Sequence, residues 1–160
     1  MRIVRQGVLA TALGIALMGC GVQPTGVIGA GEPASGLTRG MRLYYVASSG
    51  LRPVPLIDRE IGPDIGWVLK LLLDPPEGLV NLLQLGGYTV SVRGARVTVE
   101  IDGSYGGTGR DLGTGQMVCT LASARSAAAP GTDSDEVEVV LSPSKGPEQG
   151  PYRCADYFVR

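Results

Sequence analysis

The stretch that decides the fold is residues 88–101, YTVSVRGARVTVEI, because it is the clearest hairpin in the chain. Tyrosine, valine and isoleucine alternate with polar residues on both sides of Gly94-Ala95. This period of two is typical of strands that bury one face, and a two-residue linker fits a tight turn. We therefore expect strands over residues 88–93 and 96–101.

Three weaker strand patterns lie outside this hairpin. Residues 41–46 (MRLYYV) alternate, and Val137, Val139 and Leu141 mark a strand near the end. Residues 51–57 (LRPVPLI) are apolar, but Pro53 and Pro55 have no N–H to donate to a neighbouring strand. We expect residues 51–57 to form an edge strand.

Two segments are expected to be helical. In residues 63–73, Pro63 suits the first helical position, Asp64 complements the helix dipole, and the segment stops before Pro75. The second helix starts at Thr114 as N-cap and ends before a solvated connection over residues 126–135. Its apolar face comprises Met117, Val118, Leu121 and Ala124. Residues 79–85 are expected to form a short turn of helix or a packed cover.

The order of these elements predicts the fold class. Strand, edge strand, helix, hairpin, helix and strand follow one another along the chain. We expect an α+β fold in which a mainly antiparallel sheet carries two helices packed on one face. The length allows one hydrophobic core, so we expect a single domain over residues 41–160.

The start of the chain has the pattern of an export signal. Arg2 and Arg5 precede an apolar run over residues 7–18, which is shorter than the about 20 residues of a permanent membrane helix. Residues 17–20 (LMGC) resemble the bacterial lipobox. We expect residues 1–19 to be a lipoprotein signal peptide and Cys20 to be the acylated first mature residue. The alternatives are an ordinary secretory signal with an incidental cysteine, or a core helix.

Residues 20–40 are rich in glycine, proline, serine and threonine and show no periodicity. They are expected to be a flexible tether that reaches roughly 25 Å by random-coil scaling. The protein would then be lipid-anchored on the outer face of the cytoplasmic membrane. Its partners would be membrane lipid, bound through Cys20, and an envelope protein or polymer.

The composition argues against several function classes. The chain carries 14 basic and 15 acidic residues with no basic stripe, so nucleic acid is not an expected partner. It contains no histidine, which removes the commonest general base. We predict no catalytic residues, no metal site and no cofactor, and therefore not an enzyme.

Two local patterns suggest chemistry but have simpler explanations. Residues 106–109 (GGTG) could present backbone N–H groups to an anion, but a bare glycine loop is more often a flexible connection, which is the favoured interpretation. The carboxylates of Asp133, Asp135, Glu136 and Glu138 suggest calcium, yet their spacing matches no ion-binding loop. A solvated charged run is the simpler interpretation, and Asp58 and Glu60 are expected to be surface charges.

Cysteine usage predicts one disulfide. Export removes the chain from cytosolic reductants, and a lipid on Cys20 leaves Cys119 and Cys154 as the remaining pair. The bond would tie the last segment to the second helix. The alternative is two separate buried thiols.

Several runs resemble the sporulation and spore germination (GerMN) domain of actinobacterial lipoproteins. They are residues 43–46 (LYYV), 51–54 (LRPV), 71–75 (LLLDP), 78–79 (GL) and 116–121 (QMVCTL). Their order and spacing cover nearly all of residues 41–160. The resemblance implies a module of the cell envelope and supplies no reaction.

Two functional hypotheses remain. The first is a tethered binding or scaffolding module of the bacterial envelope, whose partner is a macromolecule. The alternative is an envelope enzyme that acts on cell-wall polymer with loop carboxylates as catalysts. Trp67 is either a core residue or, with Leu71, part of an exposed patch that contacts a partner.

Acylation of Cys20 is the first testable prediction. A fatty-acid probe should label the wild-type protein in growing cells and should not label Cys20→Ala. The lipid should also carry the protein into the membrane fraction, because each buried methylene contributes about 0.8 kcal/mol. Label that persists in the variant would contradict the anchor.

Overall fold

The structure is a computed structural model that describes residues 40–57 and 60–158. The expected signal peptide, Cys20 and the tether up to residue 39 lie outside the described residues, as does Asp58. All described residues belong to one compact unit.

The described residues form an α+β fold in a single domain, which confirms the predicted class. The elements are β1 (Arg42–Ala47), β2 (Gly50–Pro55), α2 (Val68–Leu71), β3 (Tyr88–Arg93), β4 (Arg96–Ile101), α3 (Leu112–Ala128), the 3-10 helix η1 (Ser134–Glu136), β5 (Glu138–Pro143), β6 (Gln149–Tyr152) and the 3-10 helix η2 (Cys154–Tyr157).

The strands form two sheets, whereas the sequence suggested one. β1 pairs with β2, and a four-stranded sheet has the order β3-β4-β5-β6. All pairs are antiparallel except β4 with β5, which are parallel. Parallel neighbours need a long crossover, and α3 supplies it between β4 and β5.

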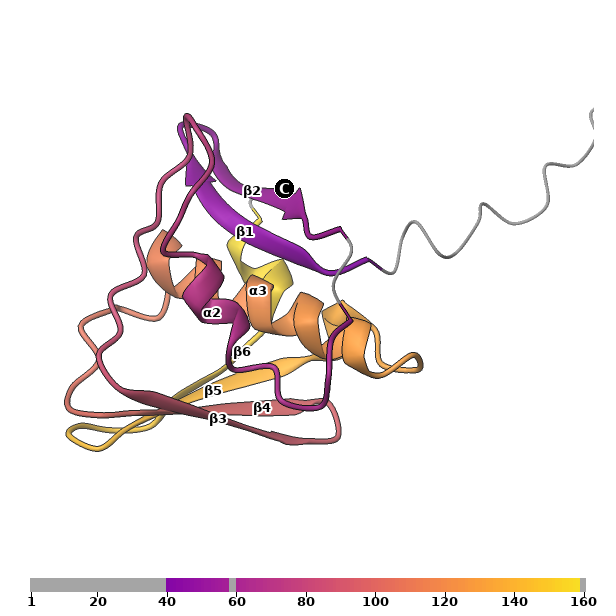
Figure 1. Ribbon diagram of the computed structural model, residues 1–160. Helices are drawn as coiled ribbons and strands as arrows, with labels where there is room; N and C mark the ends of the chain where they lie inside the picture. The colour runs from indigo at the N-terminus through magenta and orange to yellow at the C-terminus, as the bar shows by residue number, and fades with distance from the viewer. Residues whose placement is uncertain (1–39, 58–59, 159–160) are drawn as a thin grey trace, which may run out of the picture. The chain divides into compact units, whose positions relative to one another are not determined.

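α3 lies between the two sheets rather than on one outer face (Figure 1). The β1-β2 hairpin covers one side of the helix and the four-stranded sheet covers the other. Residues 113–124 are all buried. Both helices lie on one face of the four-stranded sheet, as expected, and the β1-β2 hairpin adds a second cover over α3 that the sequence did not predict.

The central hairpin matches its prediction residue for residue. β3 and β4 pair from Tyr88↔Ile101 to Arg93↔Arg96. Val97, Val99 and Ile101 point into the core. Gly94 has φ of +60°, a region that favours glycine.

The first helix is much shorter than expected. α2 spans only Val68–Leu71, because Asp64 closes a local turn instead of starting a helix. Its Oδ1 accepts the N–H of Gly66 at 2.9 Å, a bond that competes with helical geometry. Ile65 and Leu72 nevertheless reach the core.

The second helix is longer than expected at both ends. α3 begins at Leu112 with Asp111 as N-cap, and Thr114 lies inside its first turn. At the other end the helix continues to Ala128, so residues 126–128 are helical rather than part of a solvated connection. Asp111 replaces Thr114 as the cap because its carboxylate accepts the Thr114 N–H at 2.9 Å.

Residues 79–85 form a packed cover and contain no helix. Val80 makes an isolated bridge to Val46. Leu79, Leu83 and Leu85 are partly buried against the core. Of the two forms expected for this segment, the structure contains the packed cover.

A row of buried polar side chains on α3 accepts backbone N–H groups from β1 and from the covering segment 79–85. The Thr120 and Ser123 hydroxyls accept the N–H groups of Tyr44 at 3.0 Å and Arg42 at 2.7 Å. Gln116 Oε1 accepts the Leu82 N–H at 3.0 Å. These three helix residues are spaced to share one face, and we call them the polar seam.

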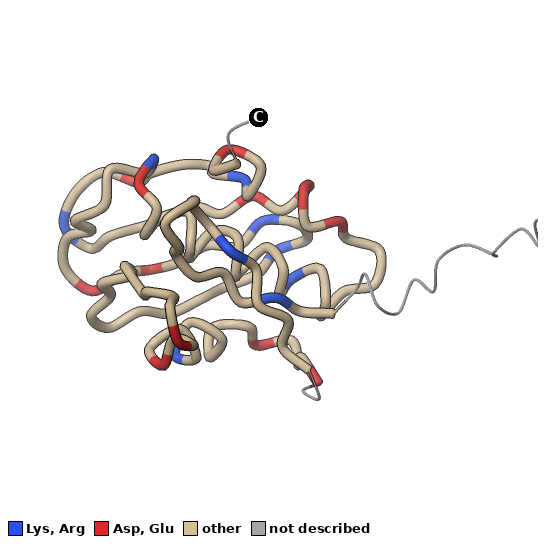
Figure 2. The backbone as a smooth tube through the Cα atoms, turned by 90° about the horizontal axis from the view of Figure 1, so that it is seen from above, with Lys and Arg blue, Asp and Glu red and all other residues tan. Residues whose placement is uncertain are grey.

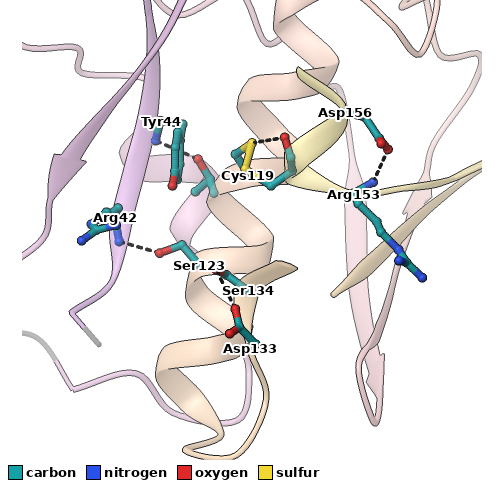
Figure 3. The surroundings of a disulfide bond; sticks show 10 residues. Arg42, Tyr44, Cys119, Ser123, Asp133, Ser134, Arg153 and Asp156 are labelled. Carbon is teal, nitrogen blue, oxygen red and sulfur yellow. Dashed lines mark hydrogen bonds between the residues drawn. A yellow bond between two sulfur atoms is a disulfide. The ribbon is translucent and has the colours of Figure 1, made fainter. Parts of the chain in front are cut away.

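The structure joins Cys119 of α3 to Cys154 of η2 by the expected disulfide (Figure 3). The Sγ–Sγ distance is 2.06 Å and the Cα–Cα distance is 4.6 Å. Cys119 Sγ also lies 3.5 Å from the Cys154 carbonyl oxygen. That approach is a contact only, because a disulfide sulfur carries no proton.

Loss of this disulfide should lower the free energy of unfolding. The double variant Cys119→Ala/Cys154→Ala should lose about 3 to 4 kcal/mol in the chain-entropy account of closing a 35-residue loop. Urea denaturation would measure the loss. Reduction of the wild type should reproduce it, and reductant should not affect the double variant further. Two free thiols at these positions in the unfolded, unreduced protein would contradict the bond.

Candidate binding surface

A groove runs between α2 and the start of β3. One part, of about 520 Å³, is lined by Asp64, Gly66, Trp67, Lys70 and residues 86–90. A second part, of about 330 Å³, is lined by Leu69, Lys70, Leu73 and residues 83–86 together with Tyr88. The two parts share Lys70, Gly86 and Tyr88. They are therefore one continuous surface, which we call the α2-β3 groove.

Two tyrosines hold the α2 side of the groove in place. The Tyr88 hydroxyl donates to the carbonyl oxygen of Gly66 at 3.2 Å. The Tyr45 hydroxyl donates to the carbonyl oxygen of Leu71 at 3.0 Å. Burial raises the pKa of both phenols, with smaller contributions from nearby carboxylates, so both remain neutral donors at physiological pH.

Close backbone packing also fixes the floor of the groove. A Cβ added to Gly66 would lie 3.2 Å from Val90 Cβ, so a larger residue would push the loop away from β3. At Gly87 an added Cβ would collide with the Asp102 carboxylate. Gly66 therefore allows the loop before α2 to approach β3 closely, and Gly87 leaves room for the Asp102 side chain at the end of β4.

The deeper part of the groove is a leucine cup made of Leu69, Leu73, Leu83 and Leu85. Leu73 is 72% exposed, while Leu69 is buried and Leu83 and Leu85 are half-buried. Lys70 is exposed at its rim. An apolar cup with one cation beside it can accept an apolar side chain that has a carboxylate nearby.

A second hollow, of about 610 Å³, lies near the C-terminal segment. Its lining comprises Gly109, Arg110, Pro151, Tyr152, Asp156 and Tyr157. The Tyr152 and Tyr157 rings meet edge to face with centroids 6.4 Å apart. Tyr157 donates to the Gly109 carbonyl oxygen at 2.6 Å, and burial raises its pKa strongly. Tyr157 therefore fixes the wall of this hollow.

The glycine-rich loop is tied to α3 through Asp111. Asp111 Oδ2 accepts the N–H of Thr108 at 2.7 Å and the hydroxyl of Thr114 at 2.8 Å. The Tyr105 hydroxyl lies 2.7 Å from Thr114 Oγ1. Because the single Thr114 proton goes to the carboxylate, Tyr105 must donate to Thr114. The Thr108 N–H already has a partner, which weakens the interpretation of residues 106–109 as an anion site.

Two carboxylates of the acidic run over residues 133–138 have structural roles. Asp133 Oδ1 accepts the Asp135 N–H at 3.1 Å and caps η1. Glu138 pairs with Arg153 at 2.7 Å and with Arg96 at 3.2 Å, and these bonds lower the pKa of its carboxyl. Within residues 40–57 and 60–158, no group of three or more potential ligands is arranged to hold a metal ion.

Charges of both signs are interspersed along the described chain (Figure 2). Among the described residues, no helix combines the length and apolar character of a membrane span. Glu60 is exposed, as expected.

Trp67 is partly a core residue, and its expected contact with a partner stays a prediction. It is half-buried and packs against the core, and it also lines the α2-β3 groove. Leu71 packs against the core.

Sequence reasoning missed the leucine cup and the Tyr105-Thr114-Asp111 chain. The cup leucines come from segments that looked like core. The Asp111 network joins residues of an apparently structureless loop to a helix start. Asp111 ahead of Thr114 was the available signal, because aspartate is a strong N-cap residue.

No protein-family model matches the chain, and no curated protein or solved structure matches it either.

Loss of the Asp111 cap should destabilise α3 and the glycine-rich loop together. Asp111→Ala should lower the free energy of unfolding by about 0.5 to 2 kcal/mol, the usual range for loss of an N-cap. Urea denaturation at neutral pH would measure this loss. Thr132→Ala, a substitution away from the network, should stay close to wild type.

The pH dependence of the free energy of unfolding should identify the Asp111 carboxylate as the source of this stabilisation. Burial alone would raise the pKa of Asp111, but the hydrogen bonds from Thr114 and Thr108 outweigh it and lower the pKa. The folded pKa is below the unfolded one, so this stabilisation is present above the unfolded pKa and is lost as pH falls through the folded pKa. The stability difference between wild type and Asp111→Asn should therefore shrink in acid. A constant difference would contradict the assignment.

Proposed function

We propose that this chain is a lipid-anchored binding or scaffolding module of the bacterial cell envelope. Acylated Cys20 would hold it on the outer face of the cytoplasmic membrane, and residues 20–40 would tether the domain. In this proposal the domain is of the GerMN type and works without a cofactor. Its partners are membrane lipid and an envelope protein or polymer, and nucleic acid is not among them.

The observation that supports export is the Cys119–Cys154 disulfide. Disulfides persist in oxidising compartments and are rare in the cytosol. The charged and apolar start of the chain independently suggests an export signal. Both observations support a location outside the cytoplasm.

The observation that supports binding is the α2-β3 groove. Leu73 is 72% exposed beside it, and Val80 and Leu82 are 52% and 49% exposed on the covering segment. Of these three residues only Leu73 lines the apolar part of the groove, and an apolar hollow with a strongly exposed aliphatic wall is typical of an interaction site. A macromolecular partner would cover Leu73.

The alternative is an envelope enzyme that uses loop carboxylates. Hydrolysis of a glycan needs two carboxyl groups facing one cleft, about 5 to 10 Å apart. Asp64 is the carboxylate of the α2-β3 groove and Asp156 that of the tyrosine hollow. Each hollow thus contributes one carboxylate, and this favours the binding proposal.

Photo-crosslinking in intact cells would test the binding proposal. A photoreactive residue at Leu73 should form a crosslinked product in the envelope. Ile57 is the matched control, because it is equally exposed at 72% and does not line the groove. Protease or muramidase digestion of the product would distinguish a protein partner from cell-wall polymer. Equal crosslinking from both positions, or none, would contradict binding at the groove.

A further inference from the structure

Most strand edges of this fold are closed to further pairing. β1 directs the N–H groups of Arg42 and Tyr44 to the polar seam, and Val46 exchanges two hydrogen bonds with Val80. Its outer edge is therefore occupied.

The edge of β2 is closed by proline. Leu43↔Val54 and Tyr45↔Arg52 are partners in the ladder. The outer N–H groups of β1 belong to residues 42, 44 and 46, so the outer positions of β2 are 51, 53 and 55. Two of these are Pro53 and Pro55, which have no N–H to offer. β6 is short, contains Pro151 and pairs irregularly with β5.

β3 is the exception. Asp102 donates its N–H to the Gly87 carbonyl oxygen at 2.8 Å, so Gly87 faces β4. In an antiparallel pair the hydrogen-bonding direction alternates. The backbone N–H and C=O groups of Tyr88, Val90 and Val92 therefore point away from β4. Within residues 40–57 and 60–158, no backbone or side-chain group bonds to them.

The α2-β3 groove follows this open edge. It touches both Thr89 and Val90, whose side chains point to opposite faces of the sheet. A hollow that contacts both must run along the edge of the strand. Gly86 and Gly87 also line it, and without side chains they leave room for another backbone.

We propose that β3 binds an extended segment of a partner protein as an additional strand. The partner backbone would pair with Tyr88, Val90 and Val92, place an apolar side chain in the leucine cup and bring a carboxylate to Lys70. The outward N–H and C=O groups of β3 alternate at the spacing of a strand, and a peptide backbone offers the matching acceptors and donors. Lipids and glycans have no such repeating backbone. This inference rests on the proposed binding function and names its partner class.

The occupant is a free strand rather than a second copy of this chain. A second β3 could fill the cup only with Tyr88, Val90 or Val92, whose side chains are packed against their own core. A segment without a core of its own can pair its backbone and fill the cup at once.

The test begins with a short peptide selected from a random display library against the mature chain, purified in the form in which cells carry it. Residue-resolved hydrogen exchange is then compared with and without the synthetic peptide. The Val90 and Val92 amides should exchange at least about tenfold more slowly with peptide bound. The Thr89 and Ser91 amides, which already pair with β4, should not change.

Variants distinguish the contribution of backbone pairing to peptide binding from that of side-chain contacts. Val92→Pro removes an outward N–H and should weaken peptide binding about tenfold, while the matched Val92→Ala keeps the N–H and should bind like wild type. Lys70→Glu should weaken binding of an acidic peptide, and Leu73→Asp should weaken binding of its apolar anchor. Both positions are exposed, so these variants carry the test if Val92→Pro does not fold.

Three results would overturn the inference. The first is that no selected peptide loses affinity for these variants. The second is that bound peptide slows exchange at amides other than Val90 and Val92. The third is a concentration-dependent dimer in which the Val90 and Val92 amides are protected without peptide. An unlabelled Cys20 would overturn the anchor in the proposed function and leave strand addition in vitro intact. The two failures are therefore distinguishable.

Discussion

The burial of α3 between two sheets is the constraint on which the rest of the structure depends. A helix covered on both sides normally has no place for polar side chains, yet Gln116, Thr120 and Ser123 are buried here. An oxygen of each accepts a backbone N–H from the layer above, whereas the buried Gln116 Nε2 has no partner among the described residues. The polar seam therefore replaces the neighbouring strand that β1 lacks. It also fixes the register of the β1-β2 hairpin over the helix, since apolar residues there would leave buried N–H groups without partners.

The start and the middle of α3 are held by different chemistry. Asp111 caps the start and, through Thr108, holds the glycine-rich loop. Further along, Cys119 is bonded to Cys154, and the Tyr157 ring packs so closely on Gly115 that no Cβ would fit there. The last segment has few core residues of its own. It is held to α3 by one covalent bond and one aromatic ring, which also position the tyrosine hollow.

The treatment of strand edges connects the fold with the proposed function. Exposed edges promote aggregation, and proteins usually block them with proline, charge or a covering segment. Here β1 is covered, β2 carries proline on its outer positions, and β6 is short and irregular. The edge of β3 instead borders a groove with a leucine cup and Lys70. An open edge next to an apolar cup is the arrangement that strand-adding recognition domains use. In the proposed function, this edge holds an extended segment of a neighbouring envelope protein.

The sequence by itself determined the α+β class, the β3-β4 hairpin to the residue, the edge character of β2 and the cysteine pair, because each depends on local alternation, backbone chemistry or simple counting. The tertiary structure decided where α3 lies, why β4 and β5 are parallel, and how short α2 is. Periodicity in a sequence reports which face of an element is apolar and does not report how many layers cover it. The groove combines residues 64–73 with residues 83–90, and the Asp111 network joins a loop to a helix start. Such sites arise only when the chain folds, because packing, and not sequence spacing, brings their residues together.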